Sequence, residues 1–312
     1  MIPQVILDCD TGIDDALALM YLAGLHRAGE IELCAVTCTA GNTTAWQAAR
    51  NSRYVLRRCG IETVPVVAGE AAPLNVELVT TPETHGPTGL GYLCAPDGAE
   101  EVARNPGPTW REAWRRHPEA RVIVVGPATH LALWGPRSRV TLMGGAYLYP
   151  GNTTPTAEWN SWVDPHAAKR AFAQAVEPIT VCSLGVTERF TLDPASLEAV
   201  VSALGSAEIA RDLPELLRFY FEFHRAQCEG YLAQIHDLLT CMIALGQVPF
   251  TAREARVDVE ADSELLRGTT VADLRGHWDK KPNARLVQDA DVAAAHRELL
   301  RAAALLAPRS AR

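Results

Sequence analysis

Four aspartates within eight positions near the start of the chain constrain its fold more than any other feature. An apolar segment at 5–7 precedes them with the pattern of a buried parallel strand, and an apolar run at 16–22 follows with the pattern of a helix. The acids therefore lie on a strand-to-helix turn, where their charges repel one another unless a cation is bound. Carboxylate oxygens are hard ligands, so calcium or magnesium is the expected ion. The four residues are Asp8, Asp10, Asp14 and Asp15.

The rest of the chain repeats this alternation of short apolar strands and helix-length segments. Such βαβ units predict an α/β fold with a mostly parallel central sheet flanked by helices, a Rossmann-like core. The sequence shows no internal repeat and no linker, so we expect one domain over residues 1–312. Further strands are expected at 31–39, 64–68, 121–125, 140–143 and 179–183, with a short β segment at 255–259. Helices are expected at 14–28, 46–58, 109–116, 164–175 and 291–306, and the longest helical stretch at 213–245, interrupted at 229–230.

Composition excludes several classes of function. The 312 residues are 48% hydrophobic, which is enough for a large core. A net charge of -8 and a pI near 5.6 argue against nucleic acid or an anionic membrane as the main partner. No apolar stretch is long enough to span a membrane, and the first strand begins too early to leave room for a signal segment. With eight scattered cysteines and no CxxC pair, we expect reduced thiols and a cytoplasmic location.

Polar residues follow the predicted strands at the points where these strands end. In an open parallel sheet, ligands bind beyond the carboxyl ends of the strands. We therefore expect one cleft there, built from segments that are far apart in the sequence. The long, Pro- and Gly-rich segment 69–108 is expected to serve this site, because loops of that length in compact domains are usually functional. The strand ends carry residues 8–15, Asn42, 126–129 and 144–145.

Two known acidic motifs do not match the first turn. A phosphatase motif of the Asp-x-Asp-x-Thr type needs Thr or Val where Gly12 stands. An EF-hand loop needs Asp or Asn at the position of Gly12 and Glu at the position of Leu19, so it does not match either. Helix capping would account for Asp14 and Asp15 alone.

Residues 8–16 resemble the N-terminal signature of the nucleoside hydrolases, the inosine-uridine preferring family. Other segments resemble the family pattern in the expected order, over about residues 5–240. Three positions depart from it: Thr11 and Leu238 replace prolines, and His130 replaces an asparagine. The matching segments are Gly41-Asn42, His85-Gly86, 126–129, 143–145, Asn152, Glu158, Asn160, Asp164-Pro165 and His236-Asp237.

The resemblance implies hydrolysis of the N-glycosidic bond of ribonucleosides to ribose and free base, with a bound Ca²⁺. By this similarity the metal ligands are the carboxylates of Asp10, Asp15 and Asp237 and the backbone carbonyl of Val125. Asp10 would also be the general base that deprotonates a metal-bound water, and His236 the general acid for the leaving base.

The resemblance also implies a set of substrate contacts and an assembly. Residues His85, Met143, Tyr220 and His224 fit structural positions as well as substrate contacts, and that alternative stays open. The preferred base stays open too. The partner would be a small ribonucleoside and the assembly a homodimer or homotetramer. By this similarity, Asp14 and Asn160 contact the ribose 2′- and 3′-hydroxyls, and Asn152 and Glu158 contact the 5′-hydroxyl. Asn42 and Met143 lie on the sugar side, and the base region is assigned to His85, Tyr220 and His224.

Two rival functions belong to other classes. One is a calcium-dependent ribose- or nucleoside-binding protein without catalysis, which the presence of both Asp10 and His236 disfavours. The other is a magnesium-dependent phosphatase with Asp8 as its nucleophile. In the hydrolase interpretation, Asp8 instead lies behind Asp10 and orients it.

Overall fold

A nine-stranded sheet organises the computed structural model, which describes residues 2–95, 109–135, 137 and 139–308. The strand order is β10-β9-β11-β6-β5-β4-β1-β2-β3. Neighbours from β3 through to β11 are parallel, whereas β9 and β10 are antiparallel, so the predicted mostly parallel α/β sheet is confirmed. The strands are β1 Gln4–Cys9, β2 Glu32–Cys38, β3 Val66–Ala68, β4 Arg121–Val124, β5 Val140–Met143, β6 Ile179–Cys182, β9 Phe250–Val259, β10 Thr270–Asp273 and β11 Ala284–Ala290. A separate two-stranded sheet pairs β7 Thr191–Leu192 with β8 Ala233–Gln234.

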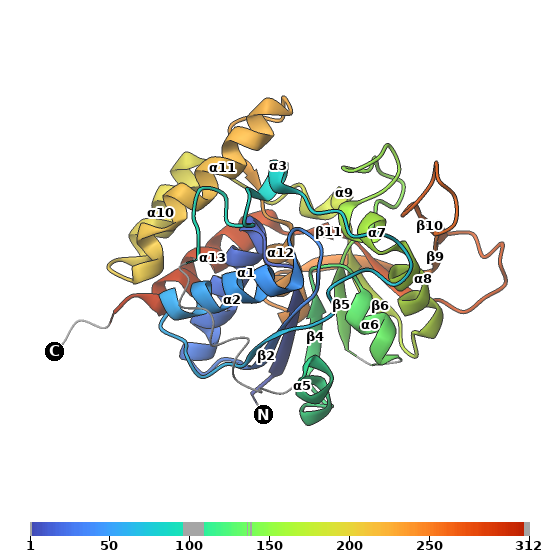
Figure 1. Ribbon diagram of the computed structural model, residues 1–312, viewed down its shortest axis with the longest axis horizontal. Helices are drawn as coiled ribbons and strands as arrows, with labels where there is room; N and C mark the ends of the chain where they lie inside the picture. Colours follow the sequence, from blue (N-terminus) through green and yellow to red (C-terminus); the bar gives the residue numbers. More distant parts are fainter. Residues whose placement is uncertain (1, 96–108, 136, 138, 309–312) are drawn as a thin grey trace.

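Helices cover both faces of the sheet (Figure 1). Apolar residues on one face of β1, such as Leu7, belong to the core that α1, α2, α12 and α13 cover, while Ile6 on the other face packs with α5, α6 and α8. Burial on both faces explains why the strands read as continuous apolar runs. The helices are α1 Ile13–Arg27, α2 Ala45–Arg58, α3 Pro82–His85, α5 Trp110–Arg116, α6 Thr129–Trp134, α7 Trp159–Val163, α8 Pro165–Gln174, α9 Leu184–Thr187, α10 Pro194–Leu204, α11 Leu213–Ala226, α12 His236–Leu245 and α13 Val292–Leu306, with a 3₁₀ turn at Glu208–Arg211.

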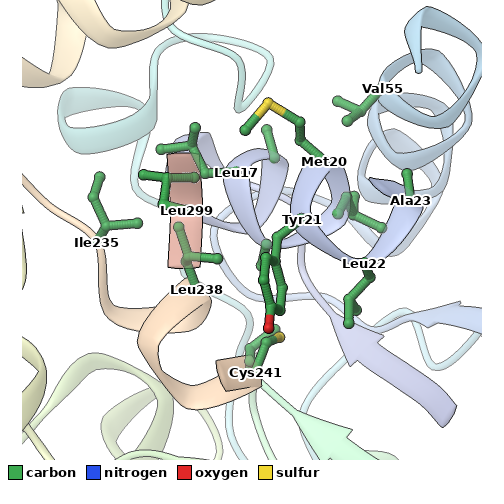
Figure 2. Packing of buried hydrophobic residues seen from close by; sticks show 14 of the residues in the cluster. Leu17, Met20, Tyr21, Leu22, Ala23, Val55, Ile235, Leu238, Cys241 and Leu299 are labelled. Carbon is green, nitrogen blue, oxygen red and sulfur yellow. The ribbon is translucent and has the colours of Figure 1, made fainter. Parts of the chain in front are cut away.

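Helix α1 is buried along almost its whole length. Residues 13–25 are all buried, because α2, α12 and α13 surround the helix. Tyr21 and Leu17 pack against Leu238 and Leu299 from α12 and α13 (Figure 2). Leu238, where the family pattern has proline, is therefore an ordinary core residue of α12. Full burial of such side chains is worth about 1.5–3 kcal/mol each, so α1 and the acidic turn before it are held firmly.

The C-terminal half differs most from the sequence-based expectation. The stretch 213–245 is not the longest helix, because α11 ends at Ala226 and a loop and β8 separate it from α12; α1 and α13 are longer, at 15 residues each. The short β segment at 255–259 belongs to the longer β9. Strand β11 was missed, although it pairs with both β6 and β9. Pairing partners so distant in sequence leave no local signal.

The long segment 69–108 is described as far as residue 95. It contains the short helix α3 Pro82–His85, and residues 96–108 lie outside the described part. Among the described helices, none combines the length and the hydropathy that crossing a membrane requires. All eight cysteines are unpaired.

Candidate active site at the carboxyl ends of the parallel strands

A cavity of about 440 Å³ lies at the carboxyl ends of the parallel strands. Twelve of the fourteen residues assigned to the site from the sequence line it. Asp10 and Asp15 are fully buried, and each accepts a hydrogen bond from Asn42, which does line the cavity. The twelve are Asp14, Asn42, His85, Val125, Met143, Asn152, Glu158, Asn160, Tyr220, His224, His236 and Asp237.

The turn between β1 and α1 is held by one of its own acids. The Asp15 carboxylate accepts hydrogen bonds from the backbone N–H groups of Gly12 (2.7 Å) and Asp10 (3.3 Å). Asp14 and Asp15 lie in the first turn of α1, where the helix dipole favours negative charge. The local sequence therefore both forms the turn and orients its carboxylates.

Two helix N-termini bring three carboxylates together. Asp14 and Asp15 begin α1, and Asp237 lies in the first turn of α12. Each of the three offers an oxygen within 4.8 Å of the others, and all three are buried. This convergence joins residues more than 200 positions apart, as the sequence analysis expected for Asp15 and Asp237.

Asp10 is held by one oxygen, and its other oxygen has no partner. Its Oδ2 accepts from the backbone N–H of Asn42 at 2.7 Å, while its buried Oδ1 accepts no hydrogen bond from any described residue. Glycines make room for it, since a Cβ on Gly41 would lie 2.1 Å from Oδ2 and one on Gly126 would lie 2.9 Å from Oδ1. Beside it, the Val125 carbonyl accepts from the Asn160 side chain at 2.8 Å.

Burial makes these carboxylates resist ionisation in the absence of a cation. Desolvation, and then the charge of Asp15, raises the pKa of Asp14 to about 8. Desolvation also raises the pKa of Asp15 to about 6, and it raises the pKa values of Asp10 and Asp237. A bound cation would offset this repulsion. The unpartnered oxygen, the three clustered carboxylates and the nearby carbonyl are oxygen donors that fit a hard metal ion.

Glu158 and Asn160 are fixed at the start of α7. The Glu158 carboxylate accepts from the backbone N–H groups of Gly145 (2.8 Å), Asn160 (2.7 Å) and Ser161 (3.0 Å). Asn152 approaches this corner because its side-chain oxygen accepts from the N–H of Trp159 at 3.0 Å. The three predicted polar contacts thus form one preorganised wall of the cavity.

Histidine and aromatic side chains form the opposite end of the cavity. Tyr220 packs between His85 and His224, with ring centroids 5.5 Å and 4.6 Å away. The Nδ1 atom of His85 accepts from the backbone N–H of Ile13 at 3.1 Å, so in the neutral ring Nε2 carries the proton. His224 places its Nδ1 2.6 Å from the Glu229 carboxylate.

His236 has the opposite tautomer. Its Nδ1 lies 2.9 Å from the Thr187 hydroxyl, which itself donates to the carbonyl of Ser183. Nδ1 must therefore donate to Thr187, and Nε2 is left free for a ligand. Desolvation, with a smaller effect of His224, lowers the pKa values of His236 and His85 to about 3.

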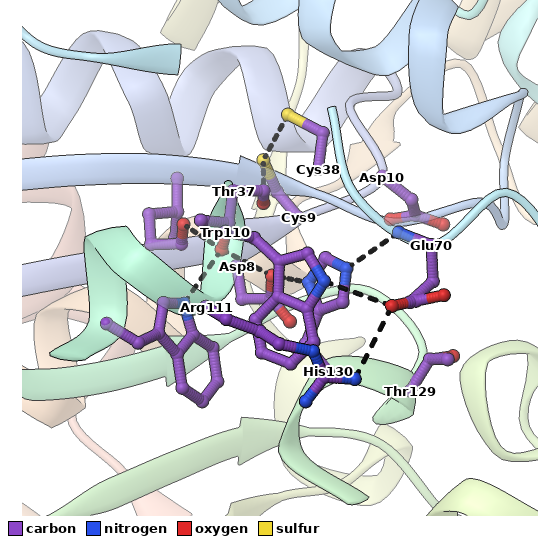
Figure 3. A network of polar contacts seen from close by, with 12 residues as sticks. Asp8, Cys9, Asp10, Thr37, Cys38, Glu70, Trp110, Arg111, Thr129 and His130 are labelled. Atoms are coloured by element: carbon purple, nitrogen blue, oxygen red, sulfur yellow. Dashed lines mark hydrogen bonds and ion pairs between the residues drawn. The ribbon is translucent and has the colours of Figure 1, made fainter. Parts of the chain in front are cut away.

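Asp8, which the sequence analysis placed behind the metal ligands rather than among them, does not line the cavity. It is fully buried, and its Oδ1 lies 2.6 Å from the Thr37 hydroxyl and 2.7 Å from His130 Nδ1 (Figure 3). Because the Thr37 hydroxyl and His130 hold its Oδ1 in a separate polar network, Asp8 is poorly placed to act as a nucleophile, which disfavours the phosphatase interpretation.

Several cavity residues were missed by the sequence analysis. Trp159 stands between two residues that were assigned, so its position offered a signal. Phe223 and Gln227 lie three and seven positions after Tyr220, which is the spacing of one helix face. Thr84, Gly151 and Thr153 are likewise next to assigned residues, whereas five others have no local signal: Thr81, Glu83, Glu188, Glu229 and Gln234.

Comparisons with known proteins identify the family of this chain. The model of the inosine-uridine preferring nucleoside hydrolase family matches residues 5–297. A pyrimidine-specific ribonucleoside hydrolase RihA from Shewanella sp. (strain MR-7) is 35% identical over 91% of this chain and 90% of its own length. RihA from Salmonella paratyphi A is 32% identical over 92% of this chain and 94% of its own length.

Solved structures show the same fold. The plant nucleoside hydrolase PpNRh1 has a TM-score of 0.84 at 24% identity, covering 99% of this chain and 100% of its own. A purine-preferring ribonucleoside hydrolase from Gardnerella vaginalis has a TM-score of 0.83 at 24% identity, covering 97% and 99%. The chain therefore belongs to the inosine-uridine preferring nucleoside hydrolase family and hydrolyses ribonucleosides to ribose and free base.

Proposed function

We propose that the chain cleaves the N-glycosidic bond of ribonucleosides with a bound Ca²⁺, with Asp10 as general base and His236 as general acid. One observation carries this proposal. The buried Oδ1 of Asp10 has no partner among the described residues, next to a cluster of three further carboxylates. A buried, unpaired carboxylate oxygen is costly, and such groups concentrate at functional sites.

Calcium suits this donor set better than magnesium. The proposed ligands are the carboxylates of Asp10, Asp15 and Asp237 and the carbonyl of Val125. Ca²⁺ takes six to eight oxygens, carbonyls included, in flexible geometry, whereas Mg²⁺ demands a near-ideal octahedron and keeps several waters. When bound, the ion would supply a water of lowered pKa.

The hydrogen bonding of Asp10 supports its proposed role as general base. The Asn42 N–H holds Oδ2, so Oδ1 is the atom that would accept the proton. Positive charge develops on the ribose in an oxocarbenium-like transition state. The buried carboxylates of Asp14 and Asp237 lie where they would stabilise that charge.

The ribose would lie between the carboxylate cluster and the start of α7. Asn160 donates through Nδ2 to Val125, so its amide oxygen is free to accept from a ribose hydroxyl. We assign the 2′- and 3′-hydroxyls to Asp14 and Asn160, and the 5′-hydroxyl to Glu158 and Asn152. Asn42 and Met143 would complete the sugar contacts, both from the cavity wall.

The leaving base would lie at the histidine end. As general acid, His236 would first have to take up a proton from solvent on Nε2, because the neutral ring carries its proton on Nδ1, which donates to Thr187. The imidazolium would then donate the Nε2 proton to the leaving base. His85 would donate from its Nε2, because Nδ1 is occupied by the N–H of Ile13. Tyr220 and His224 would flank the base.

We further propose a preference for pyrimidine ribonucleosides. Two relatives that are 35% and 32% identical over almost the whole chain, the RihA enzymes of Shewanella sp. (strain MR-7) and Salmonella paratyphi A, are described as pyrimidine-specific. The purine-preferring enzyme from Gardnerella vaginalis is more distant in sequence, at 24% identity. A homodimer or homotetramer, a cytoplasmic location and a single domain over residues 1–312 remain predictions.

A steady-state screen tests the proposed function. Turnover of uridine, cytidine, inosine, adenosine and guanosine would be measured before and after chelation, with Ca²⁺ or Mg²⁺ restored separately. We expect the highest kcat/KM for uridine and cytidine, loss of turnover on chelation, and recovery with Ca²⁺. Calcium-dependent nucleoside binding without base release would instead support the binding-protein alternative.

A further inference from the structure

A second buried polar network lies beside the candidate active site. Trp114 Nε1 donates to the Thr37 hydroxyl at 3.1 Å, and that hydroxyl donates to Asp8 Oδ1 at 2.6 Å. His130, fully buried on α6, donates from Nδ1 to the same oxygen at 2.7 Å (Figure 3). None of these four residues lines the cavity. The network therefore affects the reaction only through other residues.

Both ring nitrogens of His130 are used. The backbone N–H of Glu70 donates to Nε2 at 2.9 Å, so Nε2 is unprotonated and Nδ1 carries the proton that faces Asp8. The ring is stacked on Trp110, with centroids 4.3 Å apart and an angle of 20° between the planes. Two hydrogen bonds and a stacking contact leave this side chain one orientation.

Glu70 connects His130 to the loop that holds Asp10. The carbonyl of Glu70 accepts from the N–H of Ala40 at 3.1 Å. Two residues later, the N–H of Asn42 donates to Asp10 Oδ2 at 2.7 Å. The end of β3 therefore supports the end of β2, and the β2 loop supports the proposed general base.

His130 fits closely against the loop that follows β3. A Cβ added to Gly69 would lie 2.1 Å from His130 Nε2 and 2.3 Å from Cε1. Only glycine leaves room for the imidazole at this contact. His130 stands where the family pattern usually has asparagine. The contact between the imidazole and the loop after β3 therefore takes the place of any contact that an asparagine amide would make there.

We propose that His130 is a positioning residue, which fixes the loop at 40–42 through the backbone of Glu70 and thereby orients Asp10. The proposal rests on the proposed role of Asp10 in metal binding. In this proposal, the Nε2 atom of His130 positions the loop by accepting from the Glu70 N–H, while the hydrogen bond from Nδ1 to Asp8 holds the imidazole ring in place. Partners that orient a metal ligand typically contribute 10–100-fold to metal affinity or activity.

Two single substitutions separate the two ring nitrogens. In His130→Gln the amide oxygen reaches about as far as Nε2 and can accept from Glu70. In His130→Asn the shorter amide reaches only the place of Nδ1 and can donate to Asp8 alone. Affinity for Ca²⁺ alone would be measured by calorimetry on the full chain, with amide hydrogen exchange at Ala40 and Asn42 as a readout that needs no metal.

The expected result is a difference between the two variants. His130→Asn should weaken Ca²⁺ binding about 10–100-fold and accelerate exchange at Ala40 and Asn42. His130→Gln should keep the affinity within about threefold and keep both amides protected, even if both variants lose similar thermal stability. Gly69→Ala, which leaves His130 present but displaced, should resemble His130→Asn.

Equal effects of the two His130 variants on affinity and exchange would overturn the proposal, because a merely structural role does not distinguish the nitrogens. Unchanged calcium affinity in Gly69→Ala would also overturn it. If the unaltered protein bound no Ca²⁺, the proposed metal role of Asp10 would fail separately. The exchange comparison at Ala40 and Asn42 would then still decide whether His130 positions the loop.

Discussion

The two ends of the cavity are built in different ways. At the carboxylate end, Asp10 and Asp15 are held by backbone N–H groups at strand and helix ends, and both are fully buried. At the histidine end, Tyr220 of α11 contacts the ring of His85 on α3 and the ring of His224 on its own helix. His224 depends on Glu229, whose side chain is 46% exposed.

This difference teaches how one fold can keep a reaction and vary its substrate. The carboxylate end is supported by the central sheet, so a change there disturbs the chemistry itself. The histidine end is carried by peripheral helices and loops, which tolerate change. Substitutions at the first end should therefore abolish turnover, and those at the second should shift the choice of base.

The largest effect is expected for Asp10→Ala. Removing the proposed base and metal ligand should lower kcat by at least about 10³-fold and abolish measurable Ca²⁺ binding. Steady-state kinetics with uridine and calcium calorimetry would measure both. Asp193→Ala is a matched control, because that acid caps α10 by accepting from Ser196 and lies outside the cavity lining. Full turnover by Asp10→Ala would end the proposal for this residue.

The next largest effect is expected for His236→Ala, at the boundary between the two ends. Loss of the proposed general acid should reduce kcat on uridine or inosine about 10²-fold or more. p-Nitrophenyl riboside, whose leaving group needs no proton, should lose less than about tenfold. His277→Ala serves as the control, since this histidine is exposed and lies outside the cavity lining. Equal losses on both kinds of substrate would contradict the general-acid role.

Metal removal should destabilise the carboxylate end in a pH-dependent way. In the folded, metal-free protein the pKa of Asp14 is raised to about 8 and that of Asp15 to about 6, above the value of 3.8 for an unperturbed carboxyl. The folded state then binds more protons than the unfolded state between about pH 4 and pH 8, so stability falls as the pH rises through this window.

Thermal unfolding in the presence of chelator measures this effect. Ca²⁺ should raise Tm more at pH 8 than at pH 5, by a difference on the order of 5 °C. Asp14→Asn, which removes one ionisable group, should reduce the pH dependence in chelator. A chelated protein that is equally stable at both pH values would contradict the electrostatic account of the cluster.

The smallest effect is expected at the histidine end, for His224→Phe. The uridine-to-inosine ratio of kcat/KM should change by about threefold to tenfold, since one ring contact is altered without loss of a proposed ligand. Turnover of p-nitrophenyl riboside should stay within about twofold. Glu222→Gln, a change at a half-buried position on the same helix outside the cavity lining, should leave the ratio as it is. An unchanged ratio in His224→Phe would place His224 among the purely structural residues.

Local patterns predicted much of the carboxylate end and less of the histidine end. The strand before Asp8 and the helix after Asp15 were read correctly, because burial on both faces and helix-end chemistry leave marks in adjacent residues. Strand β11 was missed, and the interruption expected at 229–230 is a longer break between α11 and α12 that includes β8. Their positions depend on pairing and packing with segments far away in the chain.

Asp8 and Asp10 show most clearly what could not be predicted from the sequence alone. By itself, the sequence determined the α/β class and the acidic turn, since hydrophobic pattern and turn residues act over a few positions. Only the tertiary structure decided that β1 ends at Cys9, that Asp10 turns toward Asn42, and that Asp8 pairs with His130. Proton positions on His85 and His236 are likewise set by Ile13 and Thr187, partners that the folded chain alone brings within hydrogen-bonding distance.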